Sequence, residues 1–306
     1  SRPCFRGLTV NGILNIDKPR GMTSYRVVAL VKRLSSERRV GHAGTLDPLA
    51  TGVLPVCLGQ ATRVVEFLVA ARKTYRAEIE LGVTTDTYDA SGSIIQQENS
   101  AGIHKEQVEK ALSSFRGVIQ QTPPMYSALK HQGKKLYELA RAGITVERKS
   151  RPVTIHSLDI VDFQPPLVTV EVECGKGTYI RSLAHDLGQI LGCGASLKNL
   201  VRQRYGPFDI ADAVSVPQLE DAFRQGHWEH LVHPMDSVLS AWPVVVVDEA
   251  TERLIKNGSP VTLQLESTKE ARCRAYTASG HFLGVLRPDP EKGQWHPEKV
   301  FPNSRQ

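Results

Sequence analysis

Alternating apolar and polar residues mark several strands in this chain. From Tyr75 to Leu81, apolar residues alternate with Arg and Glu, which is the period of a half-buried strand. The same alternation recurs from Val168 to Cys174. In the segment from Val153 to Phe163 the alternation slips near His156, which predicts a β-bulge. The stretch from Ile13 to Pro19 predicts a further short strand that enters a loop.

Other segments place apolar residues three and four positions apart, which predicts helices. The first predicted helix is capped by Thr23 or Ser24 and has Val27, Val28, Val31 and Leu34 on one face. A second runs from Val108 to Phe115 and stops at Gly117, and a third starts at Ile180 and ends at Gly192. Shorter helices are predicted within residues 134–142 and 212–223. Glycine ends several of these patterns because it accepts the left-handed conformation that closes a helix.

The pattern changes after Trp242-Pro243, where only short apolar pieces remain. These pieces are Val244–Val247, Val261–Leu265, Arg272–Thr277 and Phe282–Leu286. Such spacing predicts a small all-β domain. We therefore expect a large domain over residues 1–243 and a small one over residues 244–306.

Charge singles out one segment of the 306-residue chain, whose formal net charge is +6. Residues 121–152 hold seven Lys and Arg against two acids, a net charge of +5. Tyr126 and Tyr137 lie among these bases, as expected where nucleobases stack. A basic segment of this kind suits nucleic acid, although a charge run is often only a solvated face.

Several classes of protein are disfavoured by the sequence. No apolar run approaches the ~18 residues of a membrane span, and no signal peptide pattern is visible. The five cysteines are far apart and never form CxxC pairs, which argues against a zinc site and for a reducing compartment, the cytoplasm. The run from Gly175 to Thr178 resembles a phosphate loop but lacks the Walker spacing. We expect no metal and no cofactor.

A loop with three glycines, Gly41–Gly52, carries the most specific candidate chemistry. Its acid, Asp47, precedes Pro48, which disfavours the helical conformation for Asp47. Such an aspartate commonly bonds its own backbone in an Asx turn. Tyr179 and Arg181 lie at a predicted strand-to-helix junction, where an arginine could pair with a buried carboxylate.

With these motifs assembled, the chain resembles the TruB type of tRNA pseudouridine synthase nearly from end to end. The matching pieces are Gly12–Pro19, Gly41–Gly52, Lys73–Tyr75, Pro124–Lys130, Gly175–Arg181, and Leu200 with Arg202. The resemblance implies an α/β (α+β) catalytic domain on a mixed, mostly antiparallel sheet, followed by a small PUA-like β domain. It also implies isomerisation of uridine 55 in the T loop of tRNA by base flipping, without a guide RNA.

The resemblance assigns a role to each candidate residue. Asp47 is the nucleophile, Arg181 keeps it charged, and Tyr75 stacks on the flipped uracil and is placed to move a proton. The residues expected to bind the RNA are His42, Tyr179, Leu200, Lys18, Lys130 and Arg202. The basic insertion, about residues 122–152, is expected to close over the T arm.

Two other readings remain open at this stage. A guide-dependent synthase subunit would share the chemistry of Asp47 but work within a ribonucleoprotein. An RNA-folding chaperone would need the basic insertion and the β domain, but not Asp47. The intact insertion and the lack of long charged tails favour a stand-alone cytoplasmic enzyme, which we expect to be a monomer.

Overall fold

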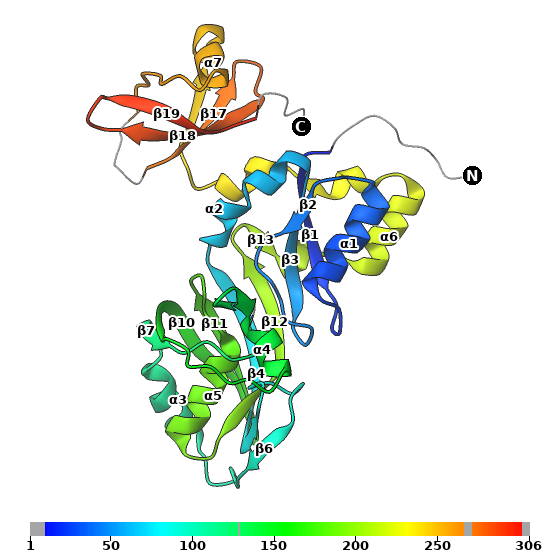
Figure 1. Cartoon of the computed structure of the whole chain (residues 1–306), viewed down its shortest axis with the longest axis vertical. Coiled ribbons are helices and arrows are strands. Elements are labelled where there is room, and N and C mark those ends of the chain that lie inside the picture. Colours follow the sequence, from blue (N-terminus) through cyan, green and yellow to red (C-terminus); the bar gives the residue numbers. More distant parts are fainter. Residues whose placement is uncertain (1–9, 128, 266–270, 302–306) are drawn as a thin grey trace.

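The computed structural model describes residues 10–127, 129–265 and 271–301 (Figure 1). An 11-stranded sheet organises most of the chain, and its main path runs β14-β1-β3-β12-β4-β11-β10-β7. The strands are β1 (Gly12–Lys18), β2 (Val40–His42), β3 (Thr51–Leu58), β4 (Lys73–Leu81), β7 (Gly117–Gln121), β10 (Arg151–Gln164), β11 (Leu167–Cys174), β12 (Ala195–Tyr205), β13 (Phe208–Asp209), β14 (Val214–Ser215) and β15 (Val232–His233). The pairs β1–β14 and β3–β12 are parallel and the other pairs of this sheet are antiparallel, so the mixed, mostly antiparallel sheet is confirmed.

The α-helices are α1 (Ser24–Ser35), α2 (Val65–Val69), α3 (Lys105–Ser113), α4 (Leu136–Arg141), α5 (Ile180–Leu191), α6 (Val216–Gln225) and α7 (Glu249–Lys256). Thr23 caps α1 by accepting a hydrogen bond from the Arg26 amide, and Gly192 closes α5 in the left-handed conformation, as predicted. The predicted end of α3 at Gly117 is wrong: the helix stops before Ser114, and Gly117 starts β7.

Two small sheets lie outside this main sheet. They are β5 (Val83–Thr85) with β6 (Ile94–Gln97), and β8 (Lys130–His131) with β9 (Lys134–Lys135). The helix expected over residues 134–142 is therefore shorter, because its first two residues belong to β9. The predicted bulge is confirmed, since the register of β10 shifts between Ile155 and Ser157.

Apolar residues of β1 and β3 are buried on both sides of the sheet. Leu14 and Leu54 belong to the main core, which α1, α3, α5 and α6 cover. Ile13 and Val53 face a second core that also contains Phe282 from the C-terminal part of the chain. Burial on both faces explains why these strands are apolar without alternation.

The C-terminal part forms a four-stranded sheet in the order β16 (Val244–Val247), β17 (Cys273–Thr277), β18 (Phe282–Asp289), β19 (Gln294–Val300). The all-β expectation missed α7, which Asp248 caps by accepting from the Thr251 amide at 2.8 Å. Val261–Leu265 is not a strand; Val261 forms only an isolated bridge with Trp295. The β19 sequence contains Pro297 and charged residues, which hid it from pattern reading.

In the part of the chain that the structure describes, no helix is both long enough and apolar enough to cross a bilayer.

Candidate active site

The loop that carries Asp47, residues 43–50, joins β2 to β3 and is fixed at several points. The Ser24 hydroxyl accepts from the Leu46 amide at 2.9 Å and donates to the Leu46 carbonyl at 3.1 Å. The Gly21 amide donates to the Pro48 carbonyl at 2.7 Å. Hydrogen bonds on both sides of Asp47 thus position this residue without using its carboxylate.

Gly44 is required by the way this loop meets β12. Its φ is +65°, a conformation that side chains disfavour. A Cβ at Gly44 would lie 2.8 Å from Cε1 of Tyr205, and the Arg202 guanidinium donates to the Gly44 carbonyl at 2.9 Å. The loop therefore packs directly against two side chains of β12.

The side chain of Arg181 reaches the Asp47 carboxylate from the first turn of α5. Its Nε lies 2.9 Å from Oδ2 of Asp47 and 3.6 Å from Oδ2 of Asp89. Its two terminal nitrogens donate to the carbonyls of Thr87, at 3.2 Å, and Tyr126, at 2.7 Å. Only 5% of the Arg181 side chain is exposed, against 42% for Asp47, so the carboxylate is the member of the pair that a substrate can reach.

The pKa of the Asp47 carboxyl is set by opposing effects in this partly enclosed site. Burial raises the pKa of Asp47 above that of an ordinary aspartate, and the Arg181 cation opposes this shift. The negative charge of Asp89 adds to the upward shift of the Asp47 pKa. A charge-assisted hydrogen bond from a buried guanidinium is a strong counterweight.

Asp89 is a site residue that the sequence analysis missed. Its side chain is buried, and its Oδ1 accepts from the Thr87 hydroxyl at 2.8 Å and the Ser91 amide at 2.9 Å. No signal in the sequence separates Asp89 from Asp86, because both lie in one polar loop with similar neighbours. Only the fold turns Asp89 toward Arg181.

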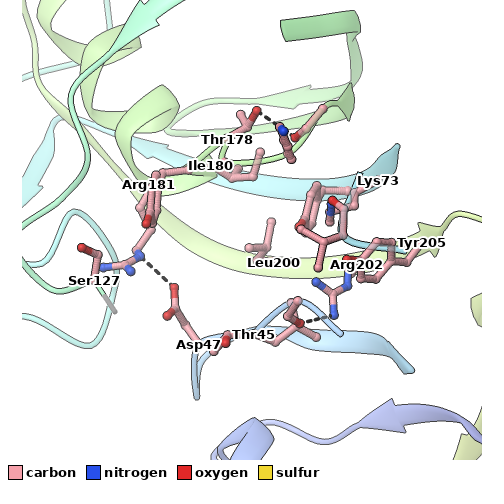
Figure 2. Close-up of a pocket in the computed structure, with 18 residues that line it drawn as sticks. Thr45, Asp47, Lys73, Ser127, Thr178, Ile180, Arg181, Leu200, Arg202 and Tyr205 are labelled. Carbon is pink, nitrogen blue, oxygen red and sulfur yellow. Dashed lines mark hydrogen bonds and ion pairs between the residues drawn. The ribbon is translucent and has the colours of Figure 1, made fainter. Parts of the chain in front are cut away.

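A cavity of about 280 Å³ brings most of the candidate residues together (Figure 2). Those that line it are Asp47, Tyr75, Tyr179, Arg181, Leu200 and Arg202. Tyr75 on β4 is buried and lies opposite Arg202 in the β4–β12 register. Burial raises the pKa of Tyr75, so its hydroxyl is neutral near pH 7.

Tyr179 is held at the cavity through its backbone. Its amide donates to the Gln121 side chain at 2.8 Å, and the Gln121 amide group donates back to its carbonyl at 3.0 Å. Gln121 is itself buried at the end of β7, next to the basic insertion. The strand that leads into the insertion therefore also fixes the start of α5.

Lys18 and His42 are not part of the cavity lining, although both lie close enough to Arg202 to interact with its charge. Lys18 is fully buried, and its ammonium donates to the Pro19 and Met22 carbonyls at 3.0 and 2.6 Å. Burial lowers the pKa of Lys18 to about 8. His42 is half-buried in β2, where burial lowers its pKa and its Nδ1 has no partner among the described residues. The Lys130 side chain lies outside the described part of the structure.

Comparison with known families shows to which family the chain that forms this site belongs. The profile described as "TruB family pseudouridylate synthase (N terminal domain)" matches residues 32–180, and that of the "tRNA pseudouridylate synthase B C-terminal domain" matches residues 181–240. The chain belongs to the TruB family. The resemblance inferred from the sequence is thus confirmed, and the Asp47 loop lies within the first matched range.

Relatives of this TruB family member match it over nearly their whole length. It is 47% identical to tRNA pseudouridine synthase B of Dehalococcoides mccartyi (strain CBDB1) over 292 residues, which is 95% of this chain and 97% of the relative. It is 44% identical to the protein of the same name from Pseudomonas aeruginosa (strain UCBPP-PA14), over 90% of this chain and 91% of the relative.

Solved structures share the fold. A crystal structure of a Cbf5-Nop10-Gar1 complex contains a chain that superposes with a TM-score of 0.74 at 27% identity, over 94% of this chain and 84% of that chain. The fold expected for the TruB family member is therefore confirmed.

Across the described ranges, no three His, Cys, Asp or Glu side chains gather closely enough to hold a metal ion. The cysteines described there, Cys57, Cys174, Cys193 and Cys273, are buried free thiols.

Proposed function

We propose that this protein isomerises uridine 55 in the T loop of tRNA to pseudouridine, with Asp47 as the nucleophile. The observation that carries the proposal is the 2.9 Å ion pair between Asp47 and Arg181 at a cavity lined by Tyr75, Tyr179 and Leu200. The names of the relatives, tRNA pseudouridine synthase B, support the same substrate.

The chemistry asks little of the protein beyond this site. The reaction breaks the N–C bond between uracil and ribose and makes a C–C bond from C5 to the same sugar, so atoms balance without a redox partner. It needs an ionised nucleophile, and a carboxylate can supply it. Arg181 favours the charged form of Asp47, which offsets the cost of burial.

The cavity is suited to hold a uracil that has left its stack. Flipping a nucleotide costs a few kcal/mol, which stacking in the pocket can offset. Tyr75 offers its ring for that contact and a neutral hydroxyl for a late proton transfer, while Leu200 and Tyr179 complete the walls. His42, half-buried beside the Asp47 loop, enters the space that the nucleotide vacates.

Other parts of the chain bind the remainder of the tRNA. The basic insertion, residues 122–152, closes over the T arm, and the Tyr126 carbonyl connects that segment to Arg181. Residues 1–243 form the catalytic domain, and residues 244–306 form a PUA-like RNA-binding domain. Lys18 is buried and held by the Pro19 and Met22 carbonyls, whereas Arg202 donates to the Gly44 carbonyl of the Asp47 loop and also lines the cavity that receives the RNA.

A stand-alone monomeric enzyme of the cytoplasm fits better than a subunit that requires a guide RNA. The chain is 47% identical to a tRNA pseudouridine synthase B but 27% identical to the chain of the Cbf5-Nop10-Gar1 complex. The curated relatives are also covered nearly completely, so they have no long additional segment.

Tritium release tests the proposal on an isolated T-arm hairpin labelled at C5 of the target uridine. The label must leave when C5 becomes bonded to the sugar. Wild type should release it, and Asp47→Ala should release none while Asp47→Asn still binds the hairpin. Release by both wild type and Asp47→Ala would remove Asp47 from the role of nucleophile. Binding without release by wild type would favour the guide-dependent subunit or the chaperone.

A further inference from the structure

The cavity has a second end that the proposed chemistry at Asp47 leaves unused. Figure 2 shows Asp47 and Arg181 on one side of the cavity and Lys73, Arg202 and Tyr205 on the opposite side, with Leu200 between them. One flipped uracil beside Asp47 does not account for the groups at the far side. We call this part of the cavity, lined by Lys73, Arg202 and Tyr205, the cationic end.

Two buried cations share one aromatic ring at the cationic end. The Lys73 ammonium lies 4.3 Å from the centre of the Tyr205 ring, and the Arg202 guanidinium carbon lies 4.8 Å from it. Lys73 is 8% exposed and Arg202 is 1% exposed. Buried charges are costly unless they are paired, and two like charges around one ring also repel each other.

The described residues provide carbonyl groups but no counter-charge for these cations. Lys73 donates to the carbonyls of Ala71 and Val69, at 3.0 and 3.3 Å. Arg202 donates to the carbonyls of Val53 and Gly44, at 2.7 and 2.9 Å. Within the described ranges neither side chain forms an ion pair with an acid.

The titratable groups that face these two cations, Cys174, Tyr75 and Tyr205, are neutral because burial raises the pKa of each, so they do not supply the missing charge. Cys174 lies opposite Lys73 in the β11–β4 register, and burial raises the pKa of its thiol to about 11. Burial likewise raises the pKa of Tyr205, whose hydroxyl is fully buried without a hydrogen-bond partner among the described residues. Burial, with a contribution from Arg202, lowers the pKa of Lys73 to about 8, as expected for an uncompensated cation.

The loop after Cys174 adds a third cation and the backbone of a glycine-rich turn. Residues 175–178 line the same cavity and lead to the start of α5. Lys176 is exposed there and forms no ion pair with the described residues. This run resembled a phosphate loop in the sequence, and the fold brings it next to the cationic end.

We propose that the cationic end is a phosphate subsite, in which Lys73, Arg202 and Lys176 receive a backbone phosphodiester next to the flipped nucleotide. This proposal rests on the proposed function, because RNA is the source of the phosphate. A phosphodiester carries the negative charge that the buried cations lack, and its oxygens accept charge-assisted hydrogen bonds from ammonium and guanidinium groups. A second nucleobase would fill space there without neutralising charge.

A scan of neutral linkages tests the subsite. T-arm hairpins with one methylphosphonate at each linkage around the target uridine are bound to an Asp47→Asn protein with and without Lys73→Met. We expect Lys73→Met to weaken binding of the unmodified hairpin about tenfold, the order of a hydrogen bond to a charged group. This loss of affinity should vanish for one hairpin only, the one whose neutral linkage replaces the phosphodiester that binds the subsite. Exposed Lys176→Gln should repeat this pattern without risk to folding, and Lys110→Gln on α3 is the matched control.

The outcomes separate the subsite from the proposed function. If Lys73→Met and Lys176→Gln each weaken hairpin binding by the same factor whichever linkage is neutral, the proposed subsite is wrong, even if wild type releases tritium from the unmodified hairpin. A second outcome would assign the subsite to a free anion instead. In that case inorganic phosphate at fixed ionic strength stabilises wild type but not Lys73→Met, and the effect of Lys73→Met on hairpin binding is the same whichever linkage is neutral. Absence of tritium release by wild type would count against the proposed function itself.

Discussion

At the scale of single residues, Arg181 connects three segments that are distant in sequence. Its guanidinium contacts the Asp47 carboxylate, the Asp89 carboxylate and the carbonyl of Tyr126 in the basic insertion. Its Nε faces both carboxylates while its terminal nitrogens donate to backbone carbonyls, and this planar set of donors fixes the side chain more firmly than an ammonium would be fixed. The position of Arg181, and with it the charge of Asp47, therefore depends on Asp89.

Asp89→Asn should reveal this dependence in a pH profile. The negative charge of Asp89 raises the pKa of Asp47, so its removal lowers that pKa and moves the acid limb of kcat/KM to lower pH. The rate on the plateau should fall by about tenfold or more, because Arg181 loses a charged partner. Single-turnover tritium release between pH 5 and 8 measures both effects. Asp86→Asn, an exposed acid of the same loop, should change neither; an acid limb of Asp89→Asn that stays in place would contradict the argument.

The sequence predicted the residues that lie in distinctive strings and missed those defined by contacts. Asp47 and Arg181 stand in glycine-rich motifs at the ends of recognisable elements. Asp89 and Tyr205 have ordinary neighbours, and their importance arises from the buried charge beside each of them. Contacts between residues so far apart in the sequence leave no local sequence pattern from which they could be predicted.

At the scale of elements, α5 is seated on β12 through a glycine. A Cβ at Gly188 would lie 2.0 Å from the Ala195 amide nitrogen and 2.3 Å from the Gly194 carbonyl carbon, both of which are backbone atoms. Gly188 also accepts a hydrogen bond from the Gly194 amide at 3.0 Å. Because Arg181 lies in the first turn of the same helix, this close approach helps to set its distance from Asp47.

Gly188→Ala should destabilise the protein although alanine is the better helix former. Helix propensity alone favours alanine by about 1 kcal/mol, but a backbone clash near 2 Å forces α5 to shift. We expect a lower Tm and a larger fall in kcat than in hairpin affinity, because the shift carries Arg181 away from Asp47. Gln189→Ala, at the exposed neighbouring position, should be nearly neutral in both measurements. A Tm equal to that of wild type would show that α5 is not held this closely.

Helices and strands could be predicted from the sequence where the spacing of their apolar residues is regular. Strands β4 and β11 and helices α1 and α5 followed from apolar spacing and end residues. Helix α7 was missed because its stability draws on its Asp248 cap and on the pairs Glu249–Arg253 and Glu252–Lys256, with Ile255 its one fully buried side chain. Strand β19 is specified by its pairing with β18 rather than by its composition.

At the scale of the whole molecule, the C-terminal sheet and the main sheet share one hydrophobic core. Phe282, Val285 and Phe301 pack in the same cluster as Ile13 and Val53 of the central strands. Around this core, Lys299 pairs with Glu66 at 2.6 Å and Arg63 donates to the Val300 carbonyl at 2.8 Å. RNA bound by both parts would therefore meet a continuous protein body, and the distribution of charge over that body should govern affinity.

Charge reversal in the basic insertion should weaken RNA binding far more than the same change elsewhere. Lys134→Glu with Lys149→Glu alters two exposed positions of the insertion, and Lys105→Glu with Lys110→Glu alters two exposed positions on α3. Each pair lowers the net charge of +6 by four, so long-range attraction falls alike in both proteins.

If the insertion contacts phosphates, its pair should raise the Kd for the hairpin by about tenfold or more and reduce the slope of log K against log salt by roughly one to two. Single-turnover chemistry on saturated RNA should change little, because Asp47 and Arg181 are untouched. Equal losses of affinity in the two pairs would mean that the insertion contributes only to the overall field, and that the T arm is held elsewhere.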